Sequence, residues 1–250
     1  MTAVLSVQRL LSAEWINPGI VTPLVVSCGF AVLARLVRGV TYSGAIAGAL
    51  ICFSLYASAG VGSFLMLVAL FALTWLATRI GYLHKKRLGA AENQDGRSAS
   101  QVLANLSTAA ICMIAFRATG KASLLLAGVA ALAEAAADTV ASEIGQSQAD
   151  TARLITSWEI VPAGTDGGIT AWGTLSGMFA AFAIVSLGAA VGLIPWQKAA
   201  IPLIAAIIGM LTDSILGAAL ERRGWLNNDL VNLLSTWVAA GLAFLCAYSL

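Results

Sequence analysis

Residues 199–220 read AAIPLIAAIIGMLTDSILGAAL, a stretch of 22 positions with a single charged side chain, Asp213. A helix that crosses a bilayer needs about 17–25 mostly apolar residues, so this stretch predicts a transmembrane helix. A carboxylate inside such a helix costs about 2.5 kcal/mol or more and normally faces a cavity or a polar partner. Asp213 is therefore the first candidate site residue, and the alternative is a buried ion pair with Arg97 or Arg222.

Seven further stretches have the same character, and the composition of the whole chain agrees with them. They lie at about 19–35, 41–58, 62–80, 101–117, 122–140, 171–193 and 230–249. Of the 250 residues, 59% are hydrophobic and 10% are charged, against about 45–50% and about 25% in soluble domains. A soluble enzyme, a secreted scaffold and a nucleic-acid-binding module are thereby excluded as the main interpretation. The predicted fold class is all-α, a polytopic membrane bundle of about seven or eight transmembrane helices that forms a single domain over residues 1–250.

The distribution of basic residues predicts the orientation of the bundle. Ten of the 14 lysines and arginines lie in the loops that follow the first, third, fifth and seventh predicted spans. Cytoplasmic loops carry the excess of basic residues, so these loops are expected inside and both termini outside. Two of them, 81–100 and 141–170, are too long for simple turns, and loops of this kind are often functional. The chain is accordingly interpreted as a protein of a bacterial inner membrane with its site on the cytoplasmic face, and residues 4–16 are expected to form a short interfacial helix.

Carboxylates gather at this predicted cytoplasmic face. Asp138 and Glu143 lie at the end of the fifth predicted span, Ser142 adds a hydroxyl, and Asp213 lies in the cytoplasmic half of the seventh span. Hard oxygen ligands of this kind are those that Mg²⁺ prefers, particularly when substrate phosphates complete its shell. The pattern predicts Mg²⁺ held by Asp138, Glu143 and Asp213, with the two aspartates as catalytic candidates. Glu134 shares a helical face with Asp138 and belongs either to the site or to a structural hydrogen bond deeper in the span.

Basic and amide side chains supply the complementary half of the site. Arg97, Gln101 and Asn105 are spaced four residues apart, which makes one polar stripe on an otherwise apolar helix. Such a stripe is expected to face the interior of the bundle. Arginine suits the bidentate recognition of phosphate, so Arg97 is a catalytic candidate and Arg153 a binding candidate, together with the two amides. Lys86 is either a further phosphate ligand or a topology determinant beside anionic lipid.

A glycine-rich turn precedes the sixth predicted span. The segment 162–170, PAGTDGGIT, has three glycines within five residues. Glycine lets a backbone approach an anion closely, and a helix N-terminus supplies free N–H groups. The spacing matches neither a Walker A loop nor GxGxxG, and a simple tight turn is the alternative. The candidate binding residues here and at the start of the eighth span are Gly164, Thr165, Gly167, Gly168, Asn228 and Asn232, with Asp166 as a catalytic candidate.

Six stretches of sequence together carry a family resemblance. In order, they are GRSASQVLAN (96–105), ADTVASEIG (137–145), RLIT (153–156), GTDGG (164–168), TDSILGA (212–218) and VNLLST (231–236). The chain from about residue 20 onward resembles the integral-membrane family, long classed as a domain of unknown function, that includes phytyl-phosphate kinase of plants and cyanobacteria.

The resemblance implies a kinase that converts an isoprenyl monophosphate into the diphosphate with a nucleoside triphosphate and Mg²⁺. CTP is implied as the nucleotide by analogy with dolichol kinases and membrane cytidylyltransferases. Carried over by position, Asp138, Glu143, Arg153, Asp166 and Asp213 would form the polar core of the site. The implied partners are the prenyl phosphate lipid, the nucleotide and the surrounding membrane lipids, with no nucleic acid; the formation of a homo-oligomer is left open.

Two other functions compete with a kinase. A membrane cytidylyltransferase would need the same Mg²⁺ ligands but would make a CDP-lipid and release pyrophosphate. A transporter would also carry acids within its spans and helices interrupted by glycine, often in two repeated halves. The chain shows no convincing internal repeat, and its polar residues gather at one face rather than at the midplane, which places the transporter last.

Overall fold

The computed structural model describes residues 18–89, 91 and 93–249, and the interfacial helix predicted at 4–16 lies outside this range. Within the described residues, eight helices are long and apolar enough to cross a membrane. This confirms the prediction of an all-α, polytopic membrane bundle. The eight helices are α2 (Pro18–Leu36), α3 (Tyr42–Ala59), α4 (Val61–Arg79), α6 (Ala99–Thr119), α7 (Ala122–Gln148), α8 (Ala171–Ala190), α9 (Ala200–Ala219) and α10 (Asn228–Tyr248).

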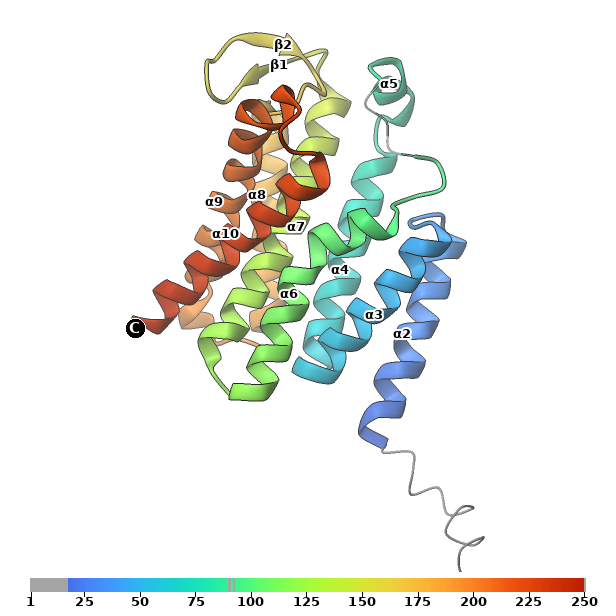
Figure 1. Ribbon diagram of the computed structural model, residues 1–250, viewed down its shortest axis with the longest axis vertical. Helices are drawn as coiled ribbons and strands as arrows, with labels where there is room; N and C mark the ends of the chain where they lie inside the picture. The colour runs from blue at the N-terminus through green and yellow to red at the C-terminus, as the bar shows by residue number, and fades with distance from the viewer. Residues whose placement is uncertain (1–17, 90, 92, 250) are drawn as a thin grey trace, which may run out of the picture.

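Helix α7 is the centre of the bundle and contacts α4, α6, α8, α9 and α10 (Figure 1). Six of its nine residues from Val129 to Ala137 are alanines, and almost all of this stretch is inaccessible to solvent. Small side chains let neighbouring helices approach closely in a membrane. The alanine-rich sequence therefore explains why α7 is surrounded by other helices.

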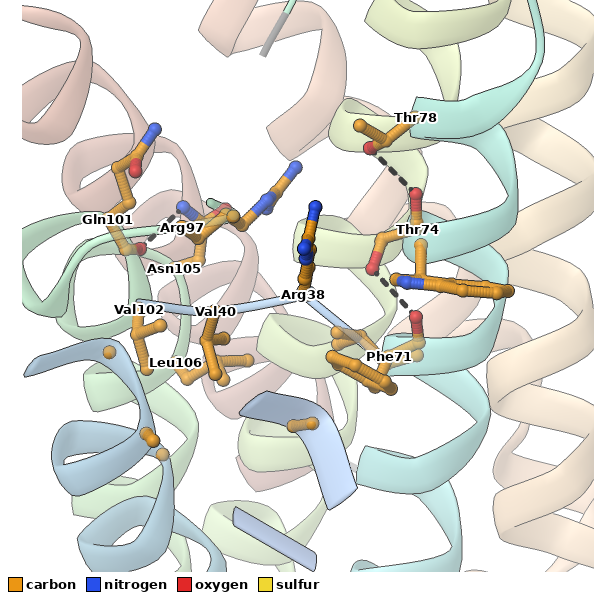
Figure 2. A pocket seen from close by; sticks show the side chains of 18 of the residues that line it. Arg38, Val40, Phe71, Thr74, Thr78, Arg97, Gln101, Val102, Asn105 and Leu106 are labelled. Carbon is orange, nitrogen blue, oxygen red and sulfur yellow. Dashed lines mark hydrogen bonds between the residues drawn. The ribbon is translucent and has the colours of Figure 1, made fainter. Parts of the chain in front are cut away.

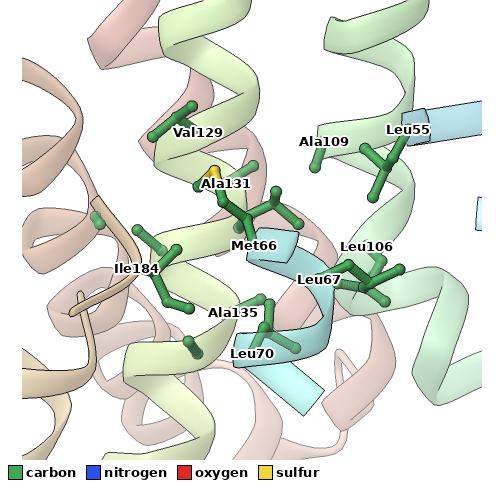
Figure 3. Packing of buried hydrophobic residues seen from close by; sticks show 14 of the residues in the cluster. Leu55, Met66, Leu67, Leu70, Leu106, Ala109, Val129, Ala131, Ala135 and Ile184 are labelled. Atoms are coloured by element: carbon green, nitrogen blue, oxygen red, sulfur yellow. The ribbon is translucent and has the colours of Figure 1, made fainter. Parts of the chain in front are cut away.

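Long apolar side chains from the surrounding helices fill the space around these alanines. Figure 3 shows Met66, Leu67 and Leu70 of α4 beside Ala131 and Ala135 of α7, all of them buried. Lipid tails are as apolar as these side chains, so close van der Waals packing stabilises the contact rather than removal from water.

Helix α8 packs against the backbone of α7 through glycine. A Cβ added at Gly173 would lie 2.5 Å from the carbonyl oxygen of Ala141 and 3.1 Å from the Cα of Gly145. Real Cβ atoms do not approach so closely, so only glycine at position 173 permits this helix contact.

Both long loops contain regular structure. In the first, α5 (Tyr82–Arg87) follows α4 directly. In the second, α7 continues to Gln148, eight residues beyond the predicted end of the span, because polar residues on one of its faces line a cavity there and weaken the hydropathy signal without ending the helix. A small antiparallel sheet follows, with β1 (Thr151–Leu154) between β2 (Ile160–Pro162) and β3 (Gly168–Ile169). We call the end of the bundle that carries α5 and this sheet the loop end (Figure 1).

Short 3₁₀ turns complete the chain, Trp196–Lys198 before α9 and Glu221–Arg223 after it. The connection between α2 and α3 is tied to the start of α6 by an isolated parallel β-bridge between Val40 and Arg97. This bridge brings a loop near residue 40 to the loop end beside α6 and α7.

Replacing Gly173 by alanine is expected to lower the free energy of unfolding by about 1–3 kcal/mol, because the added methyl group overpacks the contact between α7 and α8. Gly241→Ala is the matched control, since a Cβ at that position in α10 would meet no atom within 4 Å. The midpoint of thermal unfolding in detergent measures both changes. Equal midpoints for the two variants would contradict the close packing of α8 on α7.

Candidate functional site

A polar cavity of about 370 Å³ lies at the loop end of the bundle, next to the small sheet. Its walls come from α6, α7, α8, α9, α10 and the segment from 152 to 170. Fourteen of the sixteen predicted site residues line it: Arg97, Gln101, Asn105, Asp138, Ser142, Glu143, Gly164, Thr165, Asp166, Gly167, Gly168, Asp213, Asn228 and Asn232. Residues predicted from stretches far apart in the sequence thus converge on one space.

Two carboxyl groups face one another in this cavity. Asp138 of α7 and Asp213 of α9 lie within hydrogen-bonding reach of each other, and the Ser235 hydroxyl of α10 donates to Oδ2 of Asp213 at 3.2 Å. Among the described residues, Asp213 forms no ion pair with Arg97 or Arg222, so the alternative of a buried salt bridge does not hold there. Adjacent carboxylates repel each other unless a proton or a cation lies between them.

The donor set around Asp138 and Asp213 fits Mg²⁺ that is held jointly with a phosphate ligand. The described residues contain no group of three His, Cys, Asp or Glu side chains that could hold a metal ion alone. Mg²⁺ usually binds one or two protein carboxylates and completes its shell with water and substrate phosphates. Two facing carboxyl groups in a polar cavity meet that requirement.

Glu143, the third predicted metal ligand, is engaged elsewhere. Its Oε2 accepts a hydrogen bond from Nζ of Lys85 within an ion pair, and its Oε1 accepts one from the Thr78 hydroxyl at 3.0 Å. Nζ of Lys85 also donates to the carbonyl oxygens of Ala77 (3.1 Å) and Thr78 (2.8 Å), and the lysine side chain is fully buried. Glu143 therefore ties α7 to the junction of α4 and α5, although it borders the cavity.

Glu134 lies one helical turn deeper than Asp138 and is 1% exposed. Its Oε1 has no hydrogen-bond partner among the described residues. The side chain packs against Gly209 of α9, where a Cβ would lie 2.6 Å from the Glu134 Cγ. The Ser235 hydroxyl lies near this carboxyl group, but it donates to Oδ2 of Asp213 and to the Asn232 carbonyl oxygen. A structural hydrogen bond thus does not account for Oε1 of Glu134, and this carboxyl group extends the acidic cluster into the bundle.

Arg97 reaches the cavity from a loop and not from a helix. Ser98 is the N-cap of α6 and forms a capping box with Gln101, so the helix begins at Ala99, two residues after Arg97, the first member of the predicted stripe. The Arg97 backbone is held by Gly39, whose carbonyl accepts its N–H at 3.1 Å. Its Nη1 donates to the Thr139 hydroxyl at 3.3 Å, which places the guanidinium over α7 beside Asp138.

The amides of the predicted stripe have partly structural roles. The Oε1 of Gln101 accepts the backbone N–H of Ser98 at 2.8 Å, which completes the capping box. Nδ2 of the buried Asn105 donates to the carbonyl of Gln101 at 2.9 Å. Both side chains face the interior, as predicted, since both line the cavity.

The glycine-rich turn packs against the end of α9 and borders the cavity at the same time. Gly167 has a φ of +74°, and a Cβ there would collide with the backbone of Ala218. Close helix contact is thus sufficient reason for glycine at position 167. Within the turn, burial raises the pKa of the Asp166 carboxyl above its usual range, and the Arg222 guanidinium opposes this shift.

Two predicted binding residues lie outside the cavity. In β1, Ala152 and Leu154 are buried while Arg153 is exposed, because successive side chains of a strand point to opposite faces. Nη1 of Arg153 donates to the carbonyl of Trp158 at 3.0 Å. Lys86 is exposed on α5, whereas its neighbour Lys85 is buried.

Three contributors escaped the sequence analysis. Ser235 was quoted only as part of a motif, and no local signal marks its hydroxyl as a partner of Asp213. Lys85 stands in a basic run that resembles a solvated loop, so its burial was not predictable. Arg38, which lines a neighbouring cavity together with Arg97, lies in a short loop whose basic residues were interpreted only as topology determinants.

Comparison with known proteins finds relatives that match most of this chain. The integral membrane protein family DUF92 matches residues 25–240. "Protein VTE6, chloroplastic" of Arabidopsis thaliana is 34% identical over 220 residues, 84% of this chain and 66% of that protein. An uncharacterized membrane protein of Synechocystis sp. is 35% identical, over 76% of this chain and 75% of its own length. One of Methanocaldococcus jannaschii is 34% identical, over 86% and 89%. No solved structure matches the chain.

Replacing Lys85 by methionine is expected to lower the free energy of unfolding by about 3–5 kcal/mol, because it leaves the Glu143 carboxylate buried without its cation. Lys86→Met, the same change at the exposed neighbour, should stay within about 0.5 kcal/mol of the parent protein. Adding Glu143→Gln to Lys85→Met should recover most of the loss. Thermal unfolding in detergent measures the series, and a double variant as unstable as Lys85→Met would show that Glu143 has another role.

Proposed function

The chain belongs to the DUF92 family of integral membrane proteins, and we propose that it is an isoprenyl-phosphate kinase that uses CTP and Mg²⁺. In this reaction an oxygen of the lipid monophosphate attacks the γ-phosphorus of the nucleotide. The bond from that phosphorus to the bridging oxygen breaks, and the products are the prenyl diphosphate and CDP. The motif resemblance to the family of phytyl-phosphate kinase supports this reaction class, and the match to the DUF92 family over residues 25–240 is consistent with that resemblance.

One observation carries the proposal: carboxylates of α7 and α9, a guanidinium and a glycine turn meet in a single polar cavity. Phosphoryl transfer needs positioned reactants and stabilised charge more than covalent chemistry. A catalytic triad is therefore not required. The attacking phosphate is already ionised at neutral pH, so a strong general base is not required either.

The chemistry of each residue in the cavity suggests its role in the proposed reaction. Asp138 and Asp213 would hold Mg²⁺, which neutralises the charge on the phosphate oxygens of the nucleotide. Arg97 would bind the phosphate that is attacked or transferred, since guanidinium groups match phosphate geometry. The turn 164–168 and the amides Asn228 and Asn232 would donate hydrogen bonds to the nucleotide. Asp166, at the rim, would orient the acceptor phosphate.

Topology supports access of a water-soluble nucleotide to this site. The cavity lies at the loop end, which holds the basic loops, and such loops face the cytoplasm. We propose accordingly that the site opens to the cytoplasm at the inner membrane of a bacterium. A transporter is disfavoured, because the acids gather toward one end of the bundle.

Purified protein in detergent, incubated with geranylgeranyl monophosphate, CTP and Mg²⁺, tests the proposal directly. Geranylgeranyl diphosphate and CDP are the expected products. A CDP-lipid with pyrophosphate would instead identify a cytidylyltransferase. The kinase proposal is overturned if no diphosphate forms with any of several prenyl monophosphates and nucleoside triphosphates.

Asp138→Asn and Asp213→Asn are each expected to lower kcat about 100-fold or more, because each removes a charge that positions the nucleotide phosphates while keeping side-chain size. Arg153→Ala is the control and should retain kcat within about twofold, since its side chain points away from the cavity. Full activity of Asp213→Asn at limiting Mg²⁺ would refute the proposed metal site.

A further inference from the structure

A second cavity, of about 410 Å³, lies between α2, α3, α4 and α6. Most of its wall is apolar and includes Phe30, Leu67, Leu70, Phe71, Val102 and Leu106. Figure 2 shows Phe71, Val102 and Leu106 toward one end of this space, and the guanidinium groups of Arg38 and Arg97 toward the other. The cavity is thus amphiphilic, with an apolar body and a cationic end.

This cavity adjoins the polar cavity at one strip of α6 and the loop residue Arg97. Arg97, Gln101 and Asn105 line both of them. The Arg97 guanidinium, held on Thr139 at 3.3 Å, therefore lies where the apolar cavity meets the polar cavity of Asp138. A molecule with an apolar chain in the second cavity would present its head group to the acidic pair.

Arg38 supplies the second guanidinium group at the cationic end of the apolar cavity. Arg38 has a φ of 55°, a left-handed conformation that residues other than glycine adopt when their surroundings hold it. Here the hydrogen bond from Gly39 N to the Ala34 carbonyl (2.9 Å) closes α2. The nearby Arg79 stacks on Trp75 and donates to the Val37 carbonyl at 2.7 Å, so it stabilises the loop that carries Arg38.

Neither Arg38 nor Arg97 forms an ion pair with a carboxylate among the described residues. Guanidinium groups at the end of an apolar cavity are suited to a compact anion with several acceptor oxygens, such as a phosphate monoester. The apolar body of the cavity is suited to a hydrocarbon chain, and its volume is typical of small-molecule sites.

We propose that this cavity binds the isoprenoid chain of a prenyl monophosphate, with the phosphate held by Arg38 and Arg97 and directed toward Asp138 and Asp213. This assignment rests on the proposed kinase function and adds to it the position of the lipid substrate. The nucleotide and the lipid then occupy different cavities and meet at Arg97. A two-chain phospholipid of the bilayer is the competing occupant, since it shares the phosphate and the apolar chains.

Gly48 of α3 allows a steric test. It lines the apolar cavity, and a Cβ there would meet no atom within 4 Å, so a larger side chain can enter the space without disturbing the helix contacts. Gly48→Phe is expected to weaken the binding of radiolabelled geranylgeranyl monophosphate about tenfold or more, because the ring takes the place of the chain. Gly29→Phe makes the same change at an exposed position of α2 outside the cavity, and should bind within about twofold of the parent protein.

The head-group contact is tested by Arg38→Ala. Its affinity for geranylgeranyl monophosphate should fall about tenfold or more, because an anion loses a charged hydrogen-bond donor. Its affinity for geranylgeraniol, which has the same chain and no phosphate, should stay within about twofold. An equal loss for both ligands would mean that Arg38 supports the fold and not the phosphate.

All binding is measured without nucleotide and Mg²⁺, which separates this inference from the kinase proposal. A protein that binds the lipid as described but makes no diphosphate contradicts the kinase function alone. Diphosphate formation with equal binding by Gly48→Phe and Gly29→Phe contradicts the lipid cavity alone. Displacement of the labelled ligand by phosphatidylglycerol as readily as by unlabelled prenyl phosphate would assign the cavity to a bilayer lipid and overturn the inference.

Labelling of the unaltered protein gives a result that does not depend on how any variant folds. A geranylgeranyl monophosphate analogue with a diazirine at the end of its chain is expected to crosslink to peptides from α2, α3 or α4. Crosslinks confined to α8, α9 or α10 would overturn the assignment of this cavity.

Discussion

The interior of a membrane offers no solvent to a charged side chain, so each acid in this bundle must be satisfied by the protein or by a ligand. Glu143 is satisfied within the chain, by the ion pair with Lys85 and the hydrogen bond from Thr78. Asp138 and Asp213 face one another instead, and among the described residues neither takes part in an ion pair, although the Arg97 guanidinium lies near Asp138. This contrast distinguishes an acid that holds the fold together from two acids that would be satisfied by the cation and phosphate of the proposed reaction.

The alanine-rich middle of α7 makes that arrangement possible. Because its side chains are small, α9 and α10 approach α7 closely enough for Asp213 and Ser235 to reach the acidic face of α7. Gly209 serves the same purpose deeper in the bundle, where it leaves room for the Glu134 side chain. Larger residues along this contact would separate the carboxyl groups, so the packing of the bundle and the chemistry of the site depend on the same small side chains.

A short backbone contact determines how the two cavities relate. The bridge between Val40 and Arg97 joins the connection of α2 and α3 to the start of α6. A Cβ at Gly44 would collide with the carbonyl of Arg97, so glycine at the start of α3 is what permits this close approach. Through this contact the Arg97 side chain lies beside both the acidic pair and the apolar cavity. In the proposed reaction, a lipid and a water-soluble nucleotide must react without sharing a solvent, and a boundary residue of this kind suits that requirement.

The sequence by itself located the apolar stretches of the spans and left their number at seven or eight, because the length and apolarity of a helix are local properties that need no knowledge of its neighbours. It also pointed to Asp138 and Asp213 as candidate site residues, since a carboxylate in an apolar stretch is unusual wherever that stretch packs. Only the tertiary structure distinguished Glu143 from these two, because its cation comes from a basic loop 58 residues away in the chain. The outward direction of Arg153 likewise depended on the pairing of a short strand. Both depend on contacts between distant segments, which hydropathy and spacing do not encode.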